Sequence, residues 1–286
     1  MDLLKRKKAP LTEEAWQQVD DEARRVLKLH LAGRKVVDFS GPHGWKLGGV
    51  NTGRLKAIGK DPADEVSYAL RQVQPLVELR APFTMKIAEL DDASRGADDL
   101  DLDPVIAVAE RVAHAEDTAI FHGFKNGQVT GIIEATPHKP VPVTGILEWP
   151  RAVVAALEVL RAAGMNGPYA LALGLQAYDE LDADSEAGYP LRRRLEESLR
   201  DVSLVWAPAL QGGAVLLSVR GGDYELTVGQ DLSVGYAVHD RTDVELFLTE
   251  SFTFRVLEEK AAILLSRPPV KGKGSEEFTA LAAKKG

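Results

Sequence analysis

The chain has no cysteine among its 286 residues. It therefore has no disulfide, no thiolate ligand for a metal and no cysteine nucleophile, which fits a protein of the reducing cytoplasm. The chain also lacks a run of about 18 apolar residues, the length that a membrane-spanning helix needs. The charged residues 1–8 are not followed by an apolar stretch, so we expect no secretory signal. These absences predict a cytoplasmic protein without a membrane partner.

Positive charge is in deficit, because 35 lysine and arginine residues stand against 43 aspartate and glutamate residues, a net charge of -8. A chain of net negative charge repels the phosphate backbone, so we predict no nucleic-acid partner. The basic segment 5–8 is a local exception. We interpret it as a solvated terminus, and a binding role for this segment stays open as the alternative.

Motifs that carry enzymatic chemistry are also missing. The sequence contains no Gly-x-Ser-x-Gly nucleophile motif, no phosphate-binding glycine-rich loop that ends in Gly-Lys-Ser/Thr, and no His-Glu-x-x-His metal motif. Glu110 and His114 lie four residues apart on one predicted helix face. One such pair does not complete a metal site and fits a solvated face better. We predict no catalytic residue, no metal site and no cofactor, and therefore no enzyme.

An acidic segment that begins at Asp99 imitates a calcium-binding loop. If Asp99 is position 1, acids fall at positions 1, 3, 5 and 12, as in the calcium loop of an EF-hand. That loop turns sharply at a glycine at position 6, where this chain has Pro104 with its restricted φ. Asp103 followed by Pro104 instead predicts the beginning of a helix.

Apolar residues three and four positions apart predict three main helices. The first begins at Thr12, whose side chain is a good helix cap, and Gly33 ends it. The second covers residues 103–123, and at 1.5 Å per residue it is about 30 Å long. The third covers residues 149–163.

The rest of the chain carries strand signals. Residues 55–58 and 66–79 carry strand-like periodicity and form two extended arms joined by a polar tip, in a segment rich in glycine. This predicts a long projecting hairpin that needs a partner surface. Residues 215–219 and 224–228 flank the turn 220–223 and predict a second hairpin. Residues 244–257 alternate between apolar and polar. Helices followed by antiparallel strands, without regular β-α alternation, predict an α+β fold.

Short motifs follow one another along residues 1–265. They are MDLLKR (1–6), APLT (9–12) with Trp16, AGRKVVD (32–38), GPHGW (41–45), PLVELR (75–80), PFT (82–84), ELDD (89–92), AED (115–117), GPY (167–169), GYP (188–190), RGGD (220–223), GQDLSVGY (229–236) and ESFTF (250–254). As an ordered set these motifs resemble the encapsulins, which are also called linocin-like proteins. No single motif is decisive, but the set is specific.

The resemblance implies the α+β fold of tailed-phage major capsid proteins. It implies an N-terminal helix and arm (1–44), an E-loop (45–75), a P domain in two parts (76–134 and 215–265), an A domain (135–214) and a flexible tail (266–286). The projecting hairpin agrees with this fold, because neighbouring copies cover such arms in a shell.

The resemblance further implies a structural function. Encapsulin subunits assemble into hollow icosahedral shells, of sixty copies in the smallest, and enclose a cargo enzyme, often a ferritin-like protein or a dye-decolorizing peroxidase. A terminal targeting peptide of the cargo docks between the N-terminal helix and strands of the P domain. The matching positions are Leu27, Arg34, Asp38, Leu232, Val234, Tyr236 and Leu248. We expect the apolar ones to receive peptide side chains and Arg34 with Asp38 to bind polar groups; core residues with a structural ion pair are the alternative.

The loop that surrounds the five-fold pore in the family matches residues 182–188. Its members here are Asp182, Asp184, Ser185, Glu186 and Gly188. Acids repeated around a five-fold axis predict a negative ring that concentrates cations such as ferrous iron. A solvated acidic loop is the alternative.

Two features depart from the family. Flavin-binding members have a tryptophan just before the Glu-Leu-Asp motif, and this chain has Ala88 there, so we predict no flavin. The residues after Arg267 run past the usual end of family members. Two other functions stay open as alternatives: a phage-type capsid protein that packages DNA, and a bacteriocin-like or protease-like enzyme. The acidic charge and the missing catalytic motifs favour the shell protein.

Overall fold

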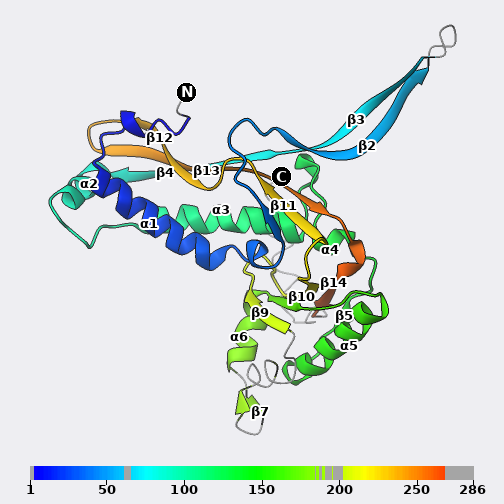
Figure 1. Ribbon diagram of the computed structural model, residues 1–286. Coiled ribbons are helices and arrows are strands. Elements are labelled where there is room, and N and C mark those ends of the chain that lie inside the picture. The colour runs from blue at the N-terminus through cyan, green and yellow to red at the C-terminus, as the bar shows by residue number, and fades with distance from the viewer. Residues whose placement is uncertain are drawn as a thin grey trace, which may run out of the picture.

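The computed structural model describes residues 3–60, 66–183, 185–186, 189–190, 195 and 202–267. Two long helices, α1 (Glu13–His30) and α3 (Asp103–Phe121), lie side by side beneath a long sheet (Figure 1). A second sheet with shorter helices lies beyond one end of α3, and a two-stranded arm projects away from the rest (Figure 1). Of the predicted tail, residues 268–286 lie outside the described residues.

The other helices are α2 (Ile87–Ser94), α4 (Ile132–Ala135), α5 (Trp149–Ala162) and α6 (Leu175–Ala183), with short 3-10 turns η1 (Arg6–Lys8), η2 (Gly33–Lys35), η3 (Lys125–Gly127), η4 (Ile146–Glu148) and η5 (Glu259–Ala261). The strands are β1 (Asp38–Ser40), β2 (Gly49–Lys60), β3 (Ser67–Pro75), β4 (Val77–Lys86), β5 (Val141–Pro142), β6 (Tyr169–Leu173), β7 (Ser185–Glu186), β8 (Tyr189–Pro190), β9 (Val202–Trp206), β10 (Gly213–Ser218), β11 (Tyr224–Val228), β12 (Ser233–His239), β13 (Asp243–Val256) and β14 (Ala262–Ser266).

The long strand β13 is the centre of the first sheet. β4 pairs with it in antiparallel fashion along one side. β12 and β11 pair with successive parts of β13, and β1 pairs in parallel with β11. The strand order is β1-β11-β13-β12, so β12 is an edge strand, and it lies close to α1.

The second sheet has the order β5-β14-β10-β6-β9. The prediction that residues 215–219 and 224–228 form a hairpin is wrong, because β10 pairs with β14 and β6 whereas β11 pairs with β13. Gly221 and Gly222 do reverse the chain, with φ of 87° and 84°. They connect the two sheets instead. Buried side chains occupy both faces of β10, which suits a central strand covered on both sides.

Two apolar clusters form the core. One packs α1 and the first half of α3 against α2, β4, β12 and β13, and the other packs the end of α3 with α5 and the second sheet. The predicted apolar stripe is confirmed, because Trp16, Val19 and Leu27 are buried. The predicted cap is also confirmed, since the Thr12 hydroxyl accepts the Ala15 N–H at 3.3 Å.

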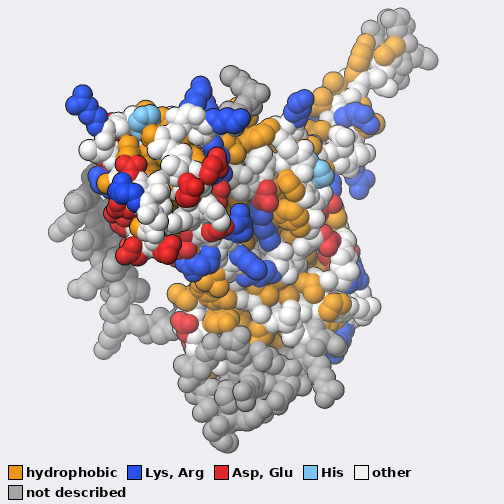
Figure 2. All heavy atoms as spheres, turned by 60° about the vertical axis from the view of Figure 1, so that its left-hand side comes forward, with side chains coloured by type: hydrophobic (Ala, Val, Ile, Leu, Met, Phe, Trp, Pro, Cys, Tyr) orange, Lys and Arg blue, Asp and Glu red, His pale blue; other side chains and the backbone are white. Residues whose placement is uncertain are grey.

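The projecting hairpin consists of β2 and β3, as the sequence predicts. Its apolar side chains point into solvent: Leu55 is 67% exposed, Ile58 62%, Tyr68 52% and Leu70 56%. Figure 2 shows hydrophobic side chains along this arm. A two-stranded sheet cannot bury such side chains by itself, so the arm needs a second surface to cover it.

Asp117 of α3 anchors the turn that follows α1. Its two carboxylate oxygens accept the backbone N–H groups of Ala32 and Gly33, each at 2.8 Å. A side chain at position 33 is excluded, because a Cβ there would lie 2.5 Å from the Ile120 Cδ1 atom. The end of α1 is therefore held against α3 by two hydrogen bonds and by close packing.

Burial raises the pKa of Asp117 to about 7, although its two N–H donors act in the opposite direction. The carboxyl is therefore protonated in the folded chain at pH values where it is ionised in the unfolded chain. Folding then binds a proton, so this group's contribution to stability is greatest below the unfolded pKa of about 4 and is lost as pH rises towards about 7.

We expect Asp117→Asn to lower the free energy of unfolding by about 1–3 kcal/mol above the raised pKa, because an amide has one acceptor oxygen for two N–H donors. The loss of stability between about pH 4 and about pH 7 should become shallower in the variant. Thermal unfolding followed by tryptophan fluorescence across this range tests both expectations. Asp21→Asn, on the exposed face of α1, is the control and should change little. An equal effect of the two substitutions contradicts the anchor.

Candidate functional site

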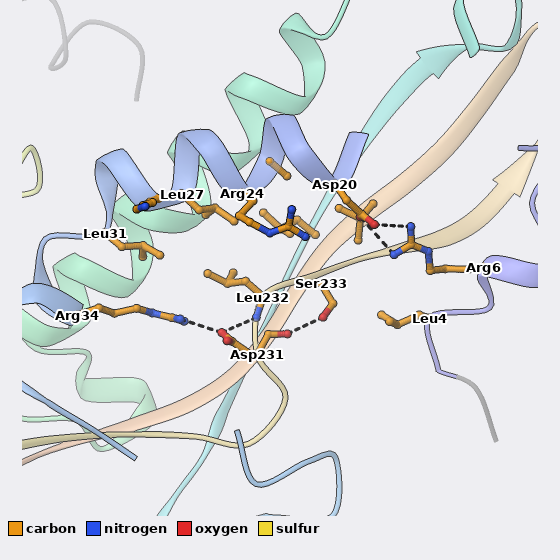
Figure 3. A pocket seen from close by; sticks show the side chains of 14 residues that line it. Leu4, Arg6, Asp20, Arg24, Leu27, Leu31, Arg34, Asp231, Leu232 and Ser233 are labelled. Carbon is orange, nitrogen blue, oxygen red and sulfur yellow. Dashed lines mark hydrogen bonds and ion pairs between the residues drawn. The ribbon is translucent and has the colours of Figure 1, made fainter. Parts of the chain in front are cut away.

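A groove of about 450 Å³ lies between α1 and the beginning of β12 (Figure 3). Five of the seven predicted peptide-binding residues line it: Leu27, Arg34, Leu232, Val234 and Leu248. They come from α1, from the turn after it, and from two neighbouring strands. The fold thus brings most of the predicted site together, and whether a peptide binds there stays a prediction.

The apolar part of the groove is the continuation of the α1 stripe. Leu27 and Leu31 point from α1 towards Leu232, which comes from the turn before β12 (Figure 3). Leu232 is only partly buried, whereas Val234 and Leu248 are 3% and 1% exposed. The floor is therefore shared with the core, and Leu232 is the apolar residue that an occupant meets most directly.

The N-terminal segment forms another wall of the groove. Arg6 donates two hydrogen bonds to the Asp20 carboxylate, at 2.7 and 3.3 Å, and its guanidinium lies 4.0 Å from the centre of the Trp16 ring. The Leu4 carbonyl accepts the backbone N–H of Tyr236 at 2.8 Å. Three contacts thus hold this segment beside β12, and Leu4 and Arg6 line the groove.

Arg34 closes one end of the groove and is the centre of a charged cluster. Its guanidinium donates to Glu116 at 2.7 and 2.9 Å, to Asp231 at 2.8 Å, and to Glu250. Glu116 and Glu250 have fully buried side chains, whereas Asp231 is 40% exposed at the groove. One cation faces three carboxyl groups, so keeping all three ionised would carry a large free-energy cost of desolvation and repulsion.

Glu250 is the acid of this cluster that stays neutral most readily. Burial raises its pKa well above the ordinary value, and the neighbouring Glu116 raises it further, while Arg34 acts in the opposite direction. The ionised form of Glu250 is therefore disfavoured by its surroundings, although Arg34 lies beside it.

The structure does not bring Asp38 to the groove. Its carboxylate accepts the Gly222 N–H at 2.5 Å, beside a second, smaller pocket formed by the turn between the sheets. Among the described residues Arg34 pairs with the three acids above and not with Asp38, so the alternative of an ion pair between Arg34 and Asp38 is wrong. The reason is topological, because β1 runs beside β11 and away from α1.

Tyr236 lies behind the groove rather than in its lining. It is 8% exposed, and its hydroxyl is 2.6 Å from the His239 Nδ1 atom.

Sequence reasoning also missed residues that line the groove, among them Leu4, Arg6 and Asp231. The Arg6–Asp20 bond joins residues 14 apart and needs the path of the N-terminal segment, which no spacing rule predicts.

The predicted pore segment is described in part. Asp182 lies near the end of α6, and Ser185 and Glu186 form β7, which pairs with β8. Asp184 and Gly188 lie outside the described residues. The five-fold arrangement involves other copies, so the pore stays a prediction.

No group of three or more histidine, aspartate or glutamate side chains in the described part of the chain could hold a metal ion. The described helices include none that is long and apolar enough to cross a membrane.

Comparison with known proteins identifies the family. The family model for the encapsulating protein for peroxidase, the linocin family, matches residues 1–253. The chain belongs to the encapsulin shell proteins. It is 47% identical over 272 residues to the type 1 encapsulin shell protein of Rhodospirillum rubrum, an alignment that covers 93% of this chain and 96% of that protein. Membership confirms that this encapsulin chain is a structural protein and not an enzyme.

Solved structures confirm the fold. The encapsulin chain resembles the virus-like particle of Pyrococcus furiosus with a TM-score of 0.62 at 15% identity, over 88% of this chain and 99% of that one. It resembles the capsid of the Myoviridae phage XM1 with a TM-score of 0.50 at 12% identity, over 83% and 92% of the two chains. At these identities the likeness establishes the α+β fold of tailed-phage major capsid proteins and nothing finer.

The Arg34 cluster predicts an asymmetric mutational response. Arg34→Met should lower the free energy of unfolding by about 3–5 kcal/mol, because it leaves buried carboxyl groups without their cation. Glu250→Gln should cost less than about 1 kcal/mol, because it copies the shape of the carboxyl and removes a charge that burial disfavours. Denaturant unfolding of the two variants tests the contrast. Similar losses in both would show that Glu250 is ionised and would contradict this description.

Proposed function

We propose that this chain assembles with copies of itself into a closed icosahedral shell of sixty subunits in the cytoplasm. The shell encloses an enzyme whose terminal targeting peptide docks in the groove beside α1. Two observations support this proposal: the family membership, and a surface that one copy leaves incomplete. The cargo is a peroxidase or a ferritin-like protein, and the description of the family as an encapsulating protein for peroxidase supports the former.

The β2–β3 arm supports assembly. Its exposed apolar side chains, such as Leu55 and Leu70, are distributed along strands that have only each other as partners among the described residues. Covering a large apolar side chain is worth about 1.5–3 kcal/mol relative to leaving it in water. Several such side chains on each arm favour contact with a neighbouring copy, and repetition of that contact closes the shell.

Assembly therefore depends on the apolar arm. We expect the double variant Leu55→Asp and Leu70→Asp to give mainly small oligomers, because each charge would have to be buried at a subunit contact. Negative-stain microscopy and mass photometry measure the fraction of closed particles. Leu29→Asp, which changes an equally exposed leucine of α1, is the matched control. Normal particles from the arm variant would contradict a role of the arm in assembly.

The groove supports cargo docking. It combines an apolar floor with charged ends, which is the usual composition of a site for a short peptide. Leu232 is partly exposed in it, so its replacement changes the groove surface with little effect on the core.

Cargo retention should depend on Leu232. A fluorescent protein fused to the terminal segment of the candidate cargo, a peroxidase or ferritin-like protein of the same organism, is co-expressed with the shell. We expect Leu232→Asp to lower retained fluorescence per particle by at least about tenfold, because the charge is poorly solvated in an apolar groove. Val238→Asp, on the 55% exposed outer part of β12, should leave retention unchanged. Equal retention by all three shells would contradict docking in the groove.

The acidic segment 182–188 is proposed to line a pore that admits small cations. Asp182, Asp184 and Glu186 supply the charge. Five copies of this segment around an axis would raise the local concentration of ferrous iron or other cations at the opening.

The two alternative functions have less support. A DNA-packaging capsid protein would share the fold, but the net charge of -8 offers no general attraction to DNA. An enzyme would need a nucleophile or a metal set, and neither occurs among the described residues in a recognisable arrangement.

A further inference from the structure

The edge of β12 presents unused main-chain groups to the groove. β13 occupies one side of β12 from Ser233 to Tyr236 in regular antiparallel register. No described strand occupies the other side, which faces the N-terminal segment and the groove. An open strand edge of this kind is a template for the addition of another extended chain.

The direction of the Val234 main-chain groups follows from the register. In an antiparallel pair, residues alternate between those that exchange hydrogen bonds with the partner strand and those whose N–H and C=O point away. The Tyr236 N–H points away from β13, because it donates to Leu4 at 2.8 Å. Val234 lies two residues earlier, before the bulge that follows Tyr236, so its N–H and C=O also point away.

Val234 lines the groove, and among the described residues neither of these two groups takes part in a hydrogen bond outside the sheet. The hydrogen bond from the Tyr236 N–H to the Leu4 carbonyl shows how the main chain of another segment pairs with this edge. Tyr236 is the next residue along β12, after Val234, whose N–H points away from β13. Its partner Leu4 also lines the groove. The N–H and C=O of Val234, which lines the groove, therefore lie on the same edge of β12 as this bond.

We propose that the occupant of the groove is an extended peptide that adds to the edge of β12 as a further strand, with main-chain hydrogen bonds to the N–H and C=O of Val234. This inference rests on the proposed function, because the peptide is the terminal segment of the cargo enzyme. Side chains of an added strand alternate between its two faces. Every second side chain of the peptide then faces Leu27 and Leu31 and is aliphatic, and those between face away from α1.

A strand added in this way explains why the groove is apolar on one face only. The α1 side supplies leucines, whereas the rim carries the Arg6–Asp20 and Arg34–Asp231 pairs. The main-chain hydrogen bonds give affinity, and the pockets for alternate side chains give specificity, as in other cases of strand addition.

The test is an N-methyl scan of a synthetic peptide copied from the terminus of the enzyme used in the retention experiment. Each peptide carries one N-methyl group and a fluorophore, and it is present while empty shells are disassembled and reassembled, so that it reaches a groove inside the closed shell. The fluorescence retained per particle, measured as a function of peptide concentration, gives its apparent affinity. The Leu232→Asp shell gives the background for binding outside the groove. We expect at least about a tenfold loss at the position whose N–H meets Val234 C=O, and near-normal affinity at the positions on either side of it.

Four outcomes are distinguishable. A strong loss at one position, flanked by tolerated ones, supports strand addition. Groove-dependent binding with losses that follow side-chain size, and not the direction of the N–H groups, overturns strand addition and leaves the proposed function intact. No difference between the wild-type and Leu232→Asp shells overturns the groove as the docking site, and the strand addition with it. Normal binding only after removal of residues 1–8 would show that the chain's own N-terminal segment is the occupant.

Discussion

The structure depends on how two adjacent acids of α3 hold the chain just after α1. Asp117 binds the backbone at residues 32 and 33, and Glu116 binds the side chain of Arg34. Both acids are fully buried, so water does not compete for their carboxyl groups. Because they are consecutive on one helix, they fix the end of α1 and the charged end of the groove together. The proposed peptide site is thus built onto α3.

The functional surfaces are those that one copy leaves unfinished. The β2–β3 arm exposes apolar side chains that a soluble monomer would have to bury, and no described strand pairs with the outer edge of β12. The first kind of incompleteness suits contact between identical subunits, because the same arm and its receiving surface recur on each copy. The second suits a short peptide, because the edge is narrow and lies beside an apolar helix face.

Much of the fold could be predicted from the sequence. Apolar spacing located α1, α3 and α5, and glycine with alternation located the β2–β3 arm, because these signals are local. Pairing could not be predicted in the same way. The turn 220–223 looks like a hairpin, yet its flanking strands pair with β13 and with β14, since burial in two different sheets outweighs a local turn preference. For the same reason the sequence did not show that β1 pairs with β11, which places Asp38 outside the groove.

The sequence by itself determined the family and five residues of the groove, because an ordered set of motifs is a property of residue order. It also determined which classes of site are missing, because the absence of reactive side chains is a property of composition. Only the tertiary structure decided that Arg6 and Leu4 form a wall, that Arg34 pairs with Glu116 and Asp231, and that the outer edge of β12 is open. Each of these depends on segments far apart in the chain, whose meeting is set by packing and register and leaves no periodic signal in the sequence.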